Sequence, residues 1–421
     1  MRIAFVTFGC RLNHAEALDM EASFASAGHE IVDLGTVPTA NSGTVPIVDT
    51  GTVPVDMIIV RGCSVTAKAQ KDCEKEIARL RRLYPSSQIV PTGCLPGTVP
   101  MATRASSGTV PTAHSGTVPM ATSRAYLKVQ DGCSGKCSFC IVPQFRGKPI
   151  SLPVDTILDR ARAFLAAGFR ELVITGCNLA LYRDRGTDLA GLLSALANLP
   201  PPANTDGELR TAPNAIHRIR IGSLELGFSE DRLIDMLLAH PNICRSIHIS
   251  LQSGSNRILR LMNRPYTAES VAAFCRDVRA RIGERCAFGA DVIAGFPSET
   301  DDDHDATKRI LQINTDESPI FSNLHVFPYS ERPGTPAAEF PDAIPPAIRK
   351  KRAKELEAIG RINRKTFVKQ FDGKDVVACI EKDGYGWTDE YIRLKAPPGL
   401  PRRSLQRLHV SASDCYLRVT V

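Results

Sequence analysis

Three cysteines stand close together in the stretch DGCSGKCSFCIVPQFRG: Cys133, Cys137 and Cys140, spaced as Cys-x-x-x-Cys-x-x-Cys. Three thiolates at this spacing can each bind one iron of a [4Fe–4S] cluster, which leaves the fourth iron without a protein ligand. A zinc site is the alternative, but a closed zinc site normally has four protein ligands. No further Cys or His lies between Cys140 and Cys177. The spacing therefore favours a cluster whose open iron can bind another molecule.

Composition limits the class of protein. A chain of 421 residues, 43% of them hydrophobic, predicts a globular protein of two to four domains. We expect no membrane span, because no apolar run approaches about 18 residues. Thirteen cysteines without a signal-peptide pattern indicate a reducing cytoplasm, where cysteine serves as a metal ligand, a catalytic group or a buried thiol. A net charge of +7 suits an anionic partner such as RNA.

The first part of the chain alternates apolar and amphipathic runs, which predicts an open parallel sheet with helices. Cys10, Cys63 and Cys94 each follow an expected strand within a few residues. Because ligands gather beyond the carboxyl ends of such strands, these cysteines could hold a second cluster; buried thiols are the alternative. Cys73 is expected to be a thiol on a helix face. The expected strands are 2–8, 57–60 and 87–93, and the expected helices are 15–28 and 66–84.

From residue 126 the pattern becomes a regular alternation of strands and helices, which predicts a partial, open barrel of six β/α units. Chemistry in such barrels lies at the carboxyl ends of the strands, and the cysteine motif follows the first of them. A basic helix at 348–367 and a small β-domain complete the chain. The expected barrel strands are 126–130, 171–176, 219–223, 246–251, 290–296 and 323–327.

The sequence GTVP occurs six times, within residues 35–54 and 97–122. This composition buries little apolar surface, so the two segments are predicted to be inserted low-complexity loops without a catalytic role.

Seven stretches, in one order along the chain, resemble those of the methylthiotransferases, a family of radical S-adenosylmethionine (SAM) enzymes. The resemblance implies an α/β fold of three domains: an N-terminal cluster domain with an open parallel sheet (1–122), a radical SAM partial (β/α)6 barrel (123–365) and a small C-terminal β-barrel called TRAM (366–421). It also implies a further strand and helix after Cys94, where this chain has the GTVP repeats. The stretches are TFGCRLNHAE, RGCSVTAKA, TGC, the cysteine loop, SLQSGSNRILRLMNRPYT, DVIAGFPSET and LHVFPYSERPGTP.

Within the family, SVTAKA, QDGCSGKC and LHVFPYSERPGTP resemble the MtaB type. The resemblance implies transfer of a methylthio group to C2 of threonylcarbamoyladenosine at adenosine 37, beside the tRNA anticodon. The MiaB type, acting on isopentenyladenosine in tRNA, and the RimO type, acting on an aspartate of a ribosomal protein, are alternatives. An alternative of another class is a catalytically inactive iron–sulfur protein that binds RNA.

The resemblance implies two [4Fe–4S] clusters and SAM as cofactors. Cys133, Cys137 and Cys140 would hold the SAM-binding cluster, which cleaves SAM to a 5′-deoxyadenosyl radical. The auxiliary cluster, which carries the sulfur to be inserted, would be held by Cys10, Cys63 and Cys94. The implied partners are the tRNA anticodon stem-loop, an electron donor such as flavodoxin or ferredoxin, and a sulfur source, all in the cytoplasm.

Five residues near expected strand ends are candidates for contact with SAM: Gly176, Asn178, Ser223, Glu225 and Gln252. Their side chains or backbone could bond the ribose or aminocarboxylate, although capping of strand ends explains them equally well.

Two further groups are candidates for binding anions or RNA. Arg146 is suited to a carboxylate or a phosphate. In the C-terminal domain, basic and aromatic side chains could contact phosphates and stack on bases, with a solvated face as the alternative. They are Lys382, Arg393, Arg407, Tyr385, Trp387 and Tyr391.

Overall fold

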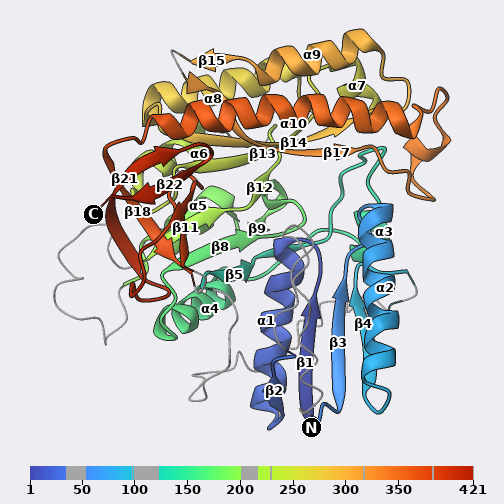
Figure 1. Ribbon diagram of the computed structural model, residues 1–421, viewed down its shortest axis with the longest axis vertical. Coiled ribbons are helices and arrows are strands. Elements are labelled where there is room, and N and C mark those ends of the chain that lie inside the picture. Colours follow the sequence, from blue (N-terminus) through green and yellow to red (C-terminus); the bar gives the residue numbers. More distant parts are fainter. Residues whose placement is uncertain are drawn as a thin grey trace.

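The computed structural model describes residues 1–34, 54–96, 98, 123–200, 217–227, 230–315, 318–381 and 384–420 (Figure 1). The two GTVP segments, predicted to be loops, lie outside these residues except for Pro54 and Thr98. In the described part of the chain, no helix has both the length and the apolar character needed to cross a membrane.

The N-terminal region is an open parallel sheet of strand order β2-β1-β3-β4, and the prediction of this fold is confirmed. Helix α1 begins directly after Cys10, four residues earlier than expected, which places the buried Asn13 in its first turn. β2 was not expected, because its three residues are too few for a periodic pattern. The elements are β1 (Arg2–Thr7), α1 (Arg11–Ser26), β2 (Glu30–Val32), β3 (Met57–Gly62), α2 (Ala67–Leu83) and β4 (Gln88–Gly93).

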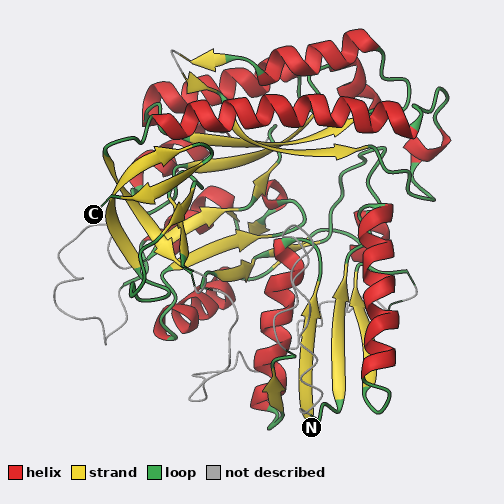
Figure 2. Cartoon of the chain, viewed as in Figure 1, coloured by secondary structure: helices red, strands yellow, loops and turns green. Residues whose placement is uncertain are grey.

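The central region contains the six expected parallel strands, so the prediction of a partial barrel is confirmed. The third strand is split at Gly222 into β11, which pairs with β8, and β12, which pairs with β13. Helices cover the outer side of the curved sheet (Figure 2). The strands are β5 (Ala125–Lys128), β8 (Glu171–Thr175), β11 (Arg218–Ile221), β12 (Ser223–Leu224), β13 (Ser246–Gln252), β14 (Ala287–Ala294) and β17 (Phe321–Pro328).

Asp188, Thr267 and Thr300 each precede one of the covering helices, and each side chain accepts a hydrogen bond from an N–H group of the first turn. Thr267 and Thr300 each form a capping box, and three aspartates in the first turn of α9 complement the helix dipole. The helices are α4 (Val154–Ala166), α5 (Leu189–Ala197), α6 (Glu230–Ala239), α8 (Ala268–Ile282), α9 (Asp301–Leu311) and α10 (Pro346–Lys369). Short elements in the connections are β6 (Gln130–Asp131), α3 (Val142–Arg146), β7 (Ile150–Ser151), η1 (Leu179–Leu181), β9 (Arg183–Asp184), β10 (Thr187–Asp188), α7 (Asn256–Leu261), β15 (Asn314–Thr315), β16 (Ser318–Pro319) and η3 (Pro336–Glu339).

The C-terminal region forms a closed barrel of strand order β18-β19-β20-β22-β21, which confirms the small β-barrel. Helix α10 leads into it and crosses the expected boundary at residue 365, so the domain boundaries stay a prediction. The strands are β18 (Lys374–Ile380), β19 (Tyr385–Thr388), β20 (Arg393–Lys395), β21 (Leu405–Ser413) and β22 (Tyr416–Val419).

A buried ionic network joins the two barrels. Glu171, on β8, has no solvent-exposed surface and accepts hydrogen bonds from Arg218 Nε (2.7 Å) and Arg220 Nε (2.8 Å). The same arginines reach the C-terminal barrel, where Arg218 bonds the Asp389 carboxylate (2.7 Å) and Arg220 bonds the carbonyl of Thr388 (2.8 Å). Glu171 therefore orients the two arginines that join the central barrel to the C-terminal barrel.

We predict that Glu171→Gln destabilises the protein. Removing one partner of a buried ion pair leaves the other charges uncompensated, which costs about 3 kcal/mol of unfolding free energy. Asp159→Asn is the matched control, because Asp159 pairs with Arg162 at 2.7 Å on the exposed face of α4. Its effect is expected to stay below about 0.5 kcal/mol. Anaerobic urea unfolding measures both, and equal effects would contradict the assignment.

The loss of stability in Glu171→Gln is also expected to depend on pH. Burial raises the pKa of Glu171, but Arg218 and Arg220 lower it more, so its pKa lies well below the usual value of 4.5. A depressed folded-state pKa stabilises the protein above the unfolded value, and this contribution is lost as the pH falls. The stability difference between the wild type and Glu171→Gln should therefore be constant above about pH 5 and shrink below pH 4.5. A difference that grows on acidification would be inconsistent with this charge network.

Candidate functional site

The central cysteine trio lies on one loop at the carboxyl end of the first barrel strand, between β6 and α3. The backbone N–H of Cys133 donates to the carbonyl of Gly147 (3.1 Å), and that of Cys140 donates to the carbonyl of Cys137 (3.1 Å). The N–H of Gly135 donates to Sγ of Cys133 at 3.2 Å. The loop thus carries the three thiols on the end of the barrel where the sequence places them.

A chain of polar side chains surrounds two of these thiols. Arg264 donates from Nη1 to Sγ of Cys137 (3.0 Å), and its Nη2 lies 3.3 Å from the carboxylate of Glu225. Glu225 accepts a hydrogen bond from Nδ2 of Asn178 (2.7 Å), which lies 4.0 Å from Sγ of Cys133. The structure therefore brings together two of the predicted SAM-contacting residues, Asn178 and Glu225, beside the cysteine loop.

The other three predicted SAM-contacting residues lie on the same group of strand ends. Gly176 directly follows β8, Ser223 is exposed on β12, and Gln252 ends β13 with a φ of +66°. Among the described residues, the side chains of Ser223 and Gln252 make no hydrogen bond to the cysteine loop. Of the five predicted residues, Asn178 and Glu225 are thus the two whose side chains are hydrogen-bonded at this site.

The second trio meets at one edge of the N-terminal sheet. Cys10, Cys63 and Cys94 follow β1, β3 and β4, which are neighbours in the sheet. The carbonyl of Gly62 accepts hydrogen bonds from the N–H of Cys94 (3.2 Å) and from Nδ2 of Asn13 (2.9 Å). The same Nδ2 also donates to the carbonyl of Phe8 (2.8 Å), before Cys10. The hydrogen bonds of Asn13 and Gly62 therefore hold the three turns that carry the cysteines together. The proximity of these turns agrees with the prediction from the parallel sheet.

Gly9 allows the first of these turns to approach the second. Its φ is +92°, a conformation that favours glycine. A Cβ at this position would lie 2.6 Å from Cβ and 3.1 Å from Sγ of Cys63. Any larger residue would push the turn that carries Cys10 away from Cys63.

Arg146 connects the two cysteine trios. From α3 in the barrel region, it donates from Nε to Sγ of Cys94 (3.0 Å) and from Nη2 to Oδ1 of Asn13 (3.0 Å). Its remaining N–H groups donate to Glu16 (2.8 and 3.1 Å) and Asp131 (3.0 Å), so all five donors of this buried guanidinium are used. Gly147, the next residue, accepts from Cys133. One arginine therefore lies between the two sites.

Glu16 and Asp131 also bind other charges at this junction. Lys128 Nζ lies 2.6 Å from a carboxylate oxygen of each, and Arg61 pairs with Glu16. Burial raises the pKa of Glu16, but the surrounding Arg146 and Lys128 lower it more, so it is ionised at neutral pH. In Figure 1 the strands of the N-terminal sheet point with their carboxyl ends toward the barrel, which brings these groups to one junction.

The donor sets suit iron–sulfur clusters. Burial raises the pKa of Cys63 and Cys140 to about 12, so these thiols ionise at neutral pH only when a metal stabilises the thiolate. Hydrogen bonds from Gly135, Arg264 and Arg146 to cysteine sulfur are of the kind that tunes such clusters. Cys73, by contrast, donates to the carbonyl of Cys63 inside the N-terminal core, as expected for a helix-face thiol.

Several residues of the site were not singled out from the sequence. Asn13 and Glu16 stand in TFGCRLNHAE, and Arg264 in SLQSGSNRILRLMNRPYT, so the family stretches contained the signal. Their partners lie far away along the chain, and local patterns carry no information on such pairs.

Two aromatic rings of the C-terminal barrel are engaged inside the protein. Trp387 stacks on Tyr391 (ring centroids 4.5 Å apart) and contacts Arg124, while Tyr391 contacts the guanidinium groups of Arg11 and Arg220. The prediction that these rings stack on RNA bases is not supported by these contacts. They instead join the C-terminal barrel to the other two regions. Lys382 lies outside the described residues.

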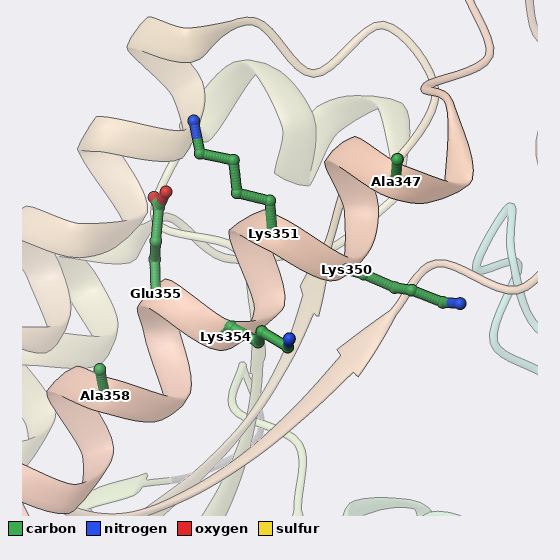
Figure 3. A pocket seen from close by; sticks show the side chains of 6 residues that line it. All are labelled: Ala347, Lys350, Lys351, Lys354, Glu355 and Ala358. Atoms are coloured by element: carbon green, nitrogen blue, oxygen red, sulfur yellow. The ribbon is translucent and has the colours of Figure 1, made fainter.

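A shallow pocket lies on the outer face of α10 (Figure 3). Its lysine side chains point away from one another and contribute positive charge but no thiol. The residues that line this pocket therefore include none of the six cysteines of the two trios. The pocket is lined by Ala347, Lys350, Lys351, Lys354, Glu355 and Ala358.

Two protein-family models match the chain. The model of the Radical SAM superfamily matches residues 127–311, which include the central cysteine loop. The model described as uncharacterized protein family UPF0004 matches residues 2–110, which include the second trio.

The fold is shared with a solved radical SAM enzyme. The structure of the radical S-adenosylmethionine methyltransferase TsrM from Kitasatospora setae, with tryptophan substrate and a SAM analog bound, superposes with a TM-score of 0.52. The two chains are 14% identical, and the match covers 80% of this chain and 75% of that one.

Curated relatives match almost the whole chain. Threonylcarbamoyladenosine tRNA methylthiotransferase MtaB of Rickettsia prowazekii is 30% identical, over 94% of this chain and 91% of the relative. The MtaB of Chlamydia pneumoniae is 31% identical, over 90% and 86%. A tRNA-2-methylthio-N(6)-dimethylallyladenosine synthase of Dichelobacter nodosus is 29% identical, over 84% and 79%. On these matches and the two cysteine trios, the chain belongs to the MtaB family of radical SAM methylthiotransferases.

Proposed function

We propose that this chain transfers a methylthio group to C2 of threonylcarbamoyladenosine at adenosine 37 of tRNA, in the cytoplasm. The main support for this proposal is the junction between the two cysteine trios. There, Arg146 bonds the thiol of Cys94 and lies next to the loop that carries Cys133. Methylthiolation requires a sulfur donor and a radical source beside one substrate carbon. Two cysteine trios at one junction meet that requirement, and a relative named for this reaction matches 94% of the chain.

Cys133, Cys137 and Cys140 would hold the SAM-binding [4Fe–4S] cluster, and Cys10, Cys63 and Cys94 the auxiliary one. When bound, these groups supply the electron that cleaves SAM and the sulfur that is inserted, chemistry that an unactivated adenine carbon requires. The protein's own part is to orient the reactants and to exclude water.

The polar chain beside the central loop is suited to holding SAM. Glu225 offers a carboxylate and Asn178 an amide between the strand ends, and Arg264 balances the charge of Glu225. A carboxylate and an amide can bond an amino group or ribose hydroxyls. Gly176, Ser223 and Gln252 would complete this contact from the neighbouring strand ends.

The partners follow from the reaction. The tRNA anticodon stem-loop supplies the substrate nucleoside, a small electron carrier such as flavodoxin or ferredoxin supplies the electron, and a sulfur source reloads the auxiliary site. Exposed Lys395 on the C-terminal barrel and the lysines of α10 offer positive charge to the phosphates of RNA.

We predict that Cys63→Ser halves the iron content. Wild-type protein purified and reconstituted without oxygen should hold about eight iron atoms per chain, and the variant about four, because one cluster loses a ligand. Cys73→Ser is the matched control, since this neighbouring buried thiol is expected to bind no metal. Iron analysis measures both, and a loss of iron in the control equal to that in Cys63→Ser would refute the ligand assignment.

We predict that Arg146→Gln loosens the contact between the N-terminal sheet and the barrel. Loss of this buried charge removes the bonds of the guanidinium to Glu16 and Asp131 and leaves Lys128 and Arg61 as their remaining charge partners, at a cost of about 3 kcal/mol, or about 100-fold in local opening. Hydrogen–deuterium exchange should accelerate accordingly in peptides from α1 and β5, which pack together.

Arg160→Gln is the control for this variant, because Arg160 bonds Asp19 of α1 across the same interface at 3.1 Å but is more exposed. Its effect should stay within about fivefold, as for a surface ion pair of about 1 kcal/mol. Similar acceleration in both variants would mean that Arg146 has no special part in the junction.

The reaction itself is tested by mass spectrometry of tRNA nucleosides. Expressed in a bacterium that lacks its own MtaB, the chain should convert threonylcarbamoyladenosine to the 2-methylthio form, whereas Cys133→Ala should not. Methylthiolation of isopentenyladenosine instead would assign the chain to the other tRNA reaction. No modified nucleoside, together with no 5′-deoxyadenosine from reduced protein and SAM, would favour the RNA-binding alternative.

A further inference from the structure

A third group of side chains that could bind a metal lies inside the barrel, on strands that carry none of the cysteines. His248 of β13, Asp291 of β14 and His325 of β17 come from three adjacent parallel strands. Their neighbours in sequence, such as Ile247 and Ala290, pack into the core beneath the helices. Because side chains alternate along a strand, the three polar groups lie on the opposite, inner face of the curved sheet.

The three ligand atoms are close together. Nε2 of His248 lies 2.9 Å from Oδ1 of Asp291, and Nδ1 of His325 lies 3.4 Å from the same oxygen. All three ligand atoms fall within 4.8 Å of one another. Nε2 of His248 is buried and has no aligned hydrogen-bond partner among the described residues, although the carboxylate is near. The arrangement thus leaves Nε2 of His248 without a well-aligned hydrogen bond.

The two separations from Oδ1 of Asp291, 2.9 and 3.4 Å, match those between ligands of one metal ion. Two ligands at about 2.1 Å from one ion are about 3.0 Å apart at an octahedral angle and about 3.4 Å apart at a tetrahedral angle. Imidazole and carboxylate together are typical ligands of zinc, ferrous iron and related ions. Three protein ligands leave at least one coordination position for water or another molecule.

The backbone of β14 orients the first ligand. His248 is the register partner of Gly289, and a Cβ at Gly289 would lie only 2.2 Å from Nδ1 of His248. The imidazole therefore occupies the space that a side chain at residue 289 would fill, with Nδ1 toward Gly289 and Nε2 toward Asp291. Glycine at this position keeps the ring in the orientation that a ligand requires.

The site is also accessible to an ion from solvent. The His325 side chain is 48% exposed, so an ion can enter, while His248 (13%) and Asp291 (21%) are more enclosed.

We propose that His248, Asp291 and His325 bind one divalent transition-metal ion in the barrel, separate from the two cysteine trios. Zinc is the probe of choice, because it has no redox chemistry and accepts two imidazoles and a carboxylate. This proposal does not depend on the methylthiotransfer reaction, since metal binding is measured without SAM or tRNA.

The experiment is zinc binding to the cluster-loaded protein, without oxygen, at free zinc concentrations set by a chelator. The wild type should bind about one zinc ion per chain more than Asp291→Asn does. His325→Gln should weaken binding at least about 10-fold. Gly289→Ala should also weaken it, although all three ligands are retained, because the new methyl group displaces the imidazole of His248.

His409→Gln is the matched control, because His409 pairs with Asp375 at 2.9 Å on the exposed face of the C-terminal barrel. It should bind zinc like the wild type. Iron content and circular dichroism check the fold of every variant, and if Asp291→Asn fails this check, His325→Gln decides, since its side chain is half exposed.

X-ray absorption at the zinc edge separates this site from the cysteines. A first shell of nitrogen and oxygen at about 2.0–2.1 Å supports the proposal, whereas sulfur at about 2.3 Å places the zinc on cysteines and overturns it. Equal zinc binding by the wild type, Asp291→Asn and His325→Gln also overturns it, and the three residues then form a metal-free ionic group.

Discussion

The guanidinium of Arg146 is the constraint on which the site depends. It bonds the Cys94 thiol, Asn13 and Glu16 of the N-terminal region and Asp131 of the barrel region, and its neighbour Gly147 closes the loop that carries Cys133. A buried arginine is stable only when its donors meet acceptors of opposite charge. The planar guanidinium of Arg146, together with the pairs Lys128–Glu16 and Arg160–Asp19, therefore fixes the position of one cysteine trio relative to the other.

The same principle holds the three regions together elsewhere. Glu171 binds two arginines that reach the C-terminal barrel, and Tyr391 contacts Arg11 of the N-terminal region and Arg220 of the barrel. The apolar clusters are largely local to each region, although Ala287 of β14 packs in the cluster of the C-terminal barrel. Directional charged contacts add to this limited apolar contact in orienting the regions, as a reaction between two separate cofactor sites requires.

Much of this arrangement could be predicted from the sequence, because it depends on local patterns. The alternation of strands and helices predicted the six barrel strands. Because ligands gather at the carboxyl ends of parallel strands, the sequence also predicted Cys10, Cys63 and Cys94 at one edge of the N-terminal sheet. Three-residue β2 was too short for a pattern to reveal. The bond from Arg264 to Cys137 and the packing of Trp387 on Tyr391 depend on partners chosen in three dimensions. A sequence records which side chains can form such bonds, but the topology decides which of them meet.

The magnetic interaction between the two proposed clusters tests most directly whether the two cysteine trios hold clusters close to each other. Electron paramagnetic resonance of the protein, reduced without oxygen, records whether the two paramagnetic centres lie close to each other. If both trios hold clusters at the Arg146 junction, the spectrum of the wild type should be broadened by spin–spin coupling and should differ from the sum of the Cys63→Ser and Cys137→Ser spectra. A wild-type spectrum equal to that sum, with iron in both sites, would contradict the central claim that the two trios face one reaction centre.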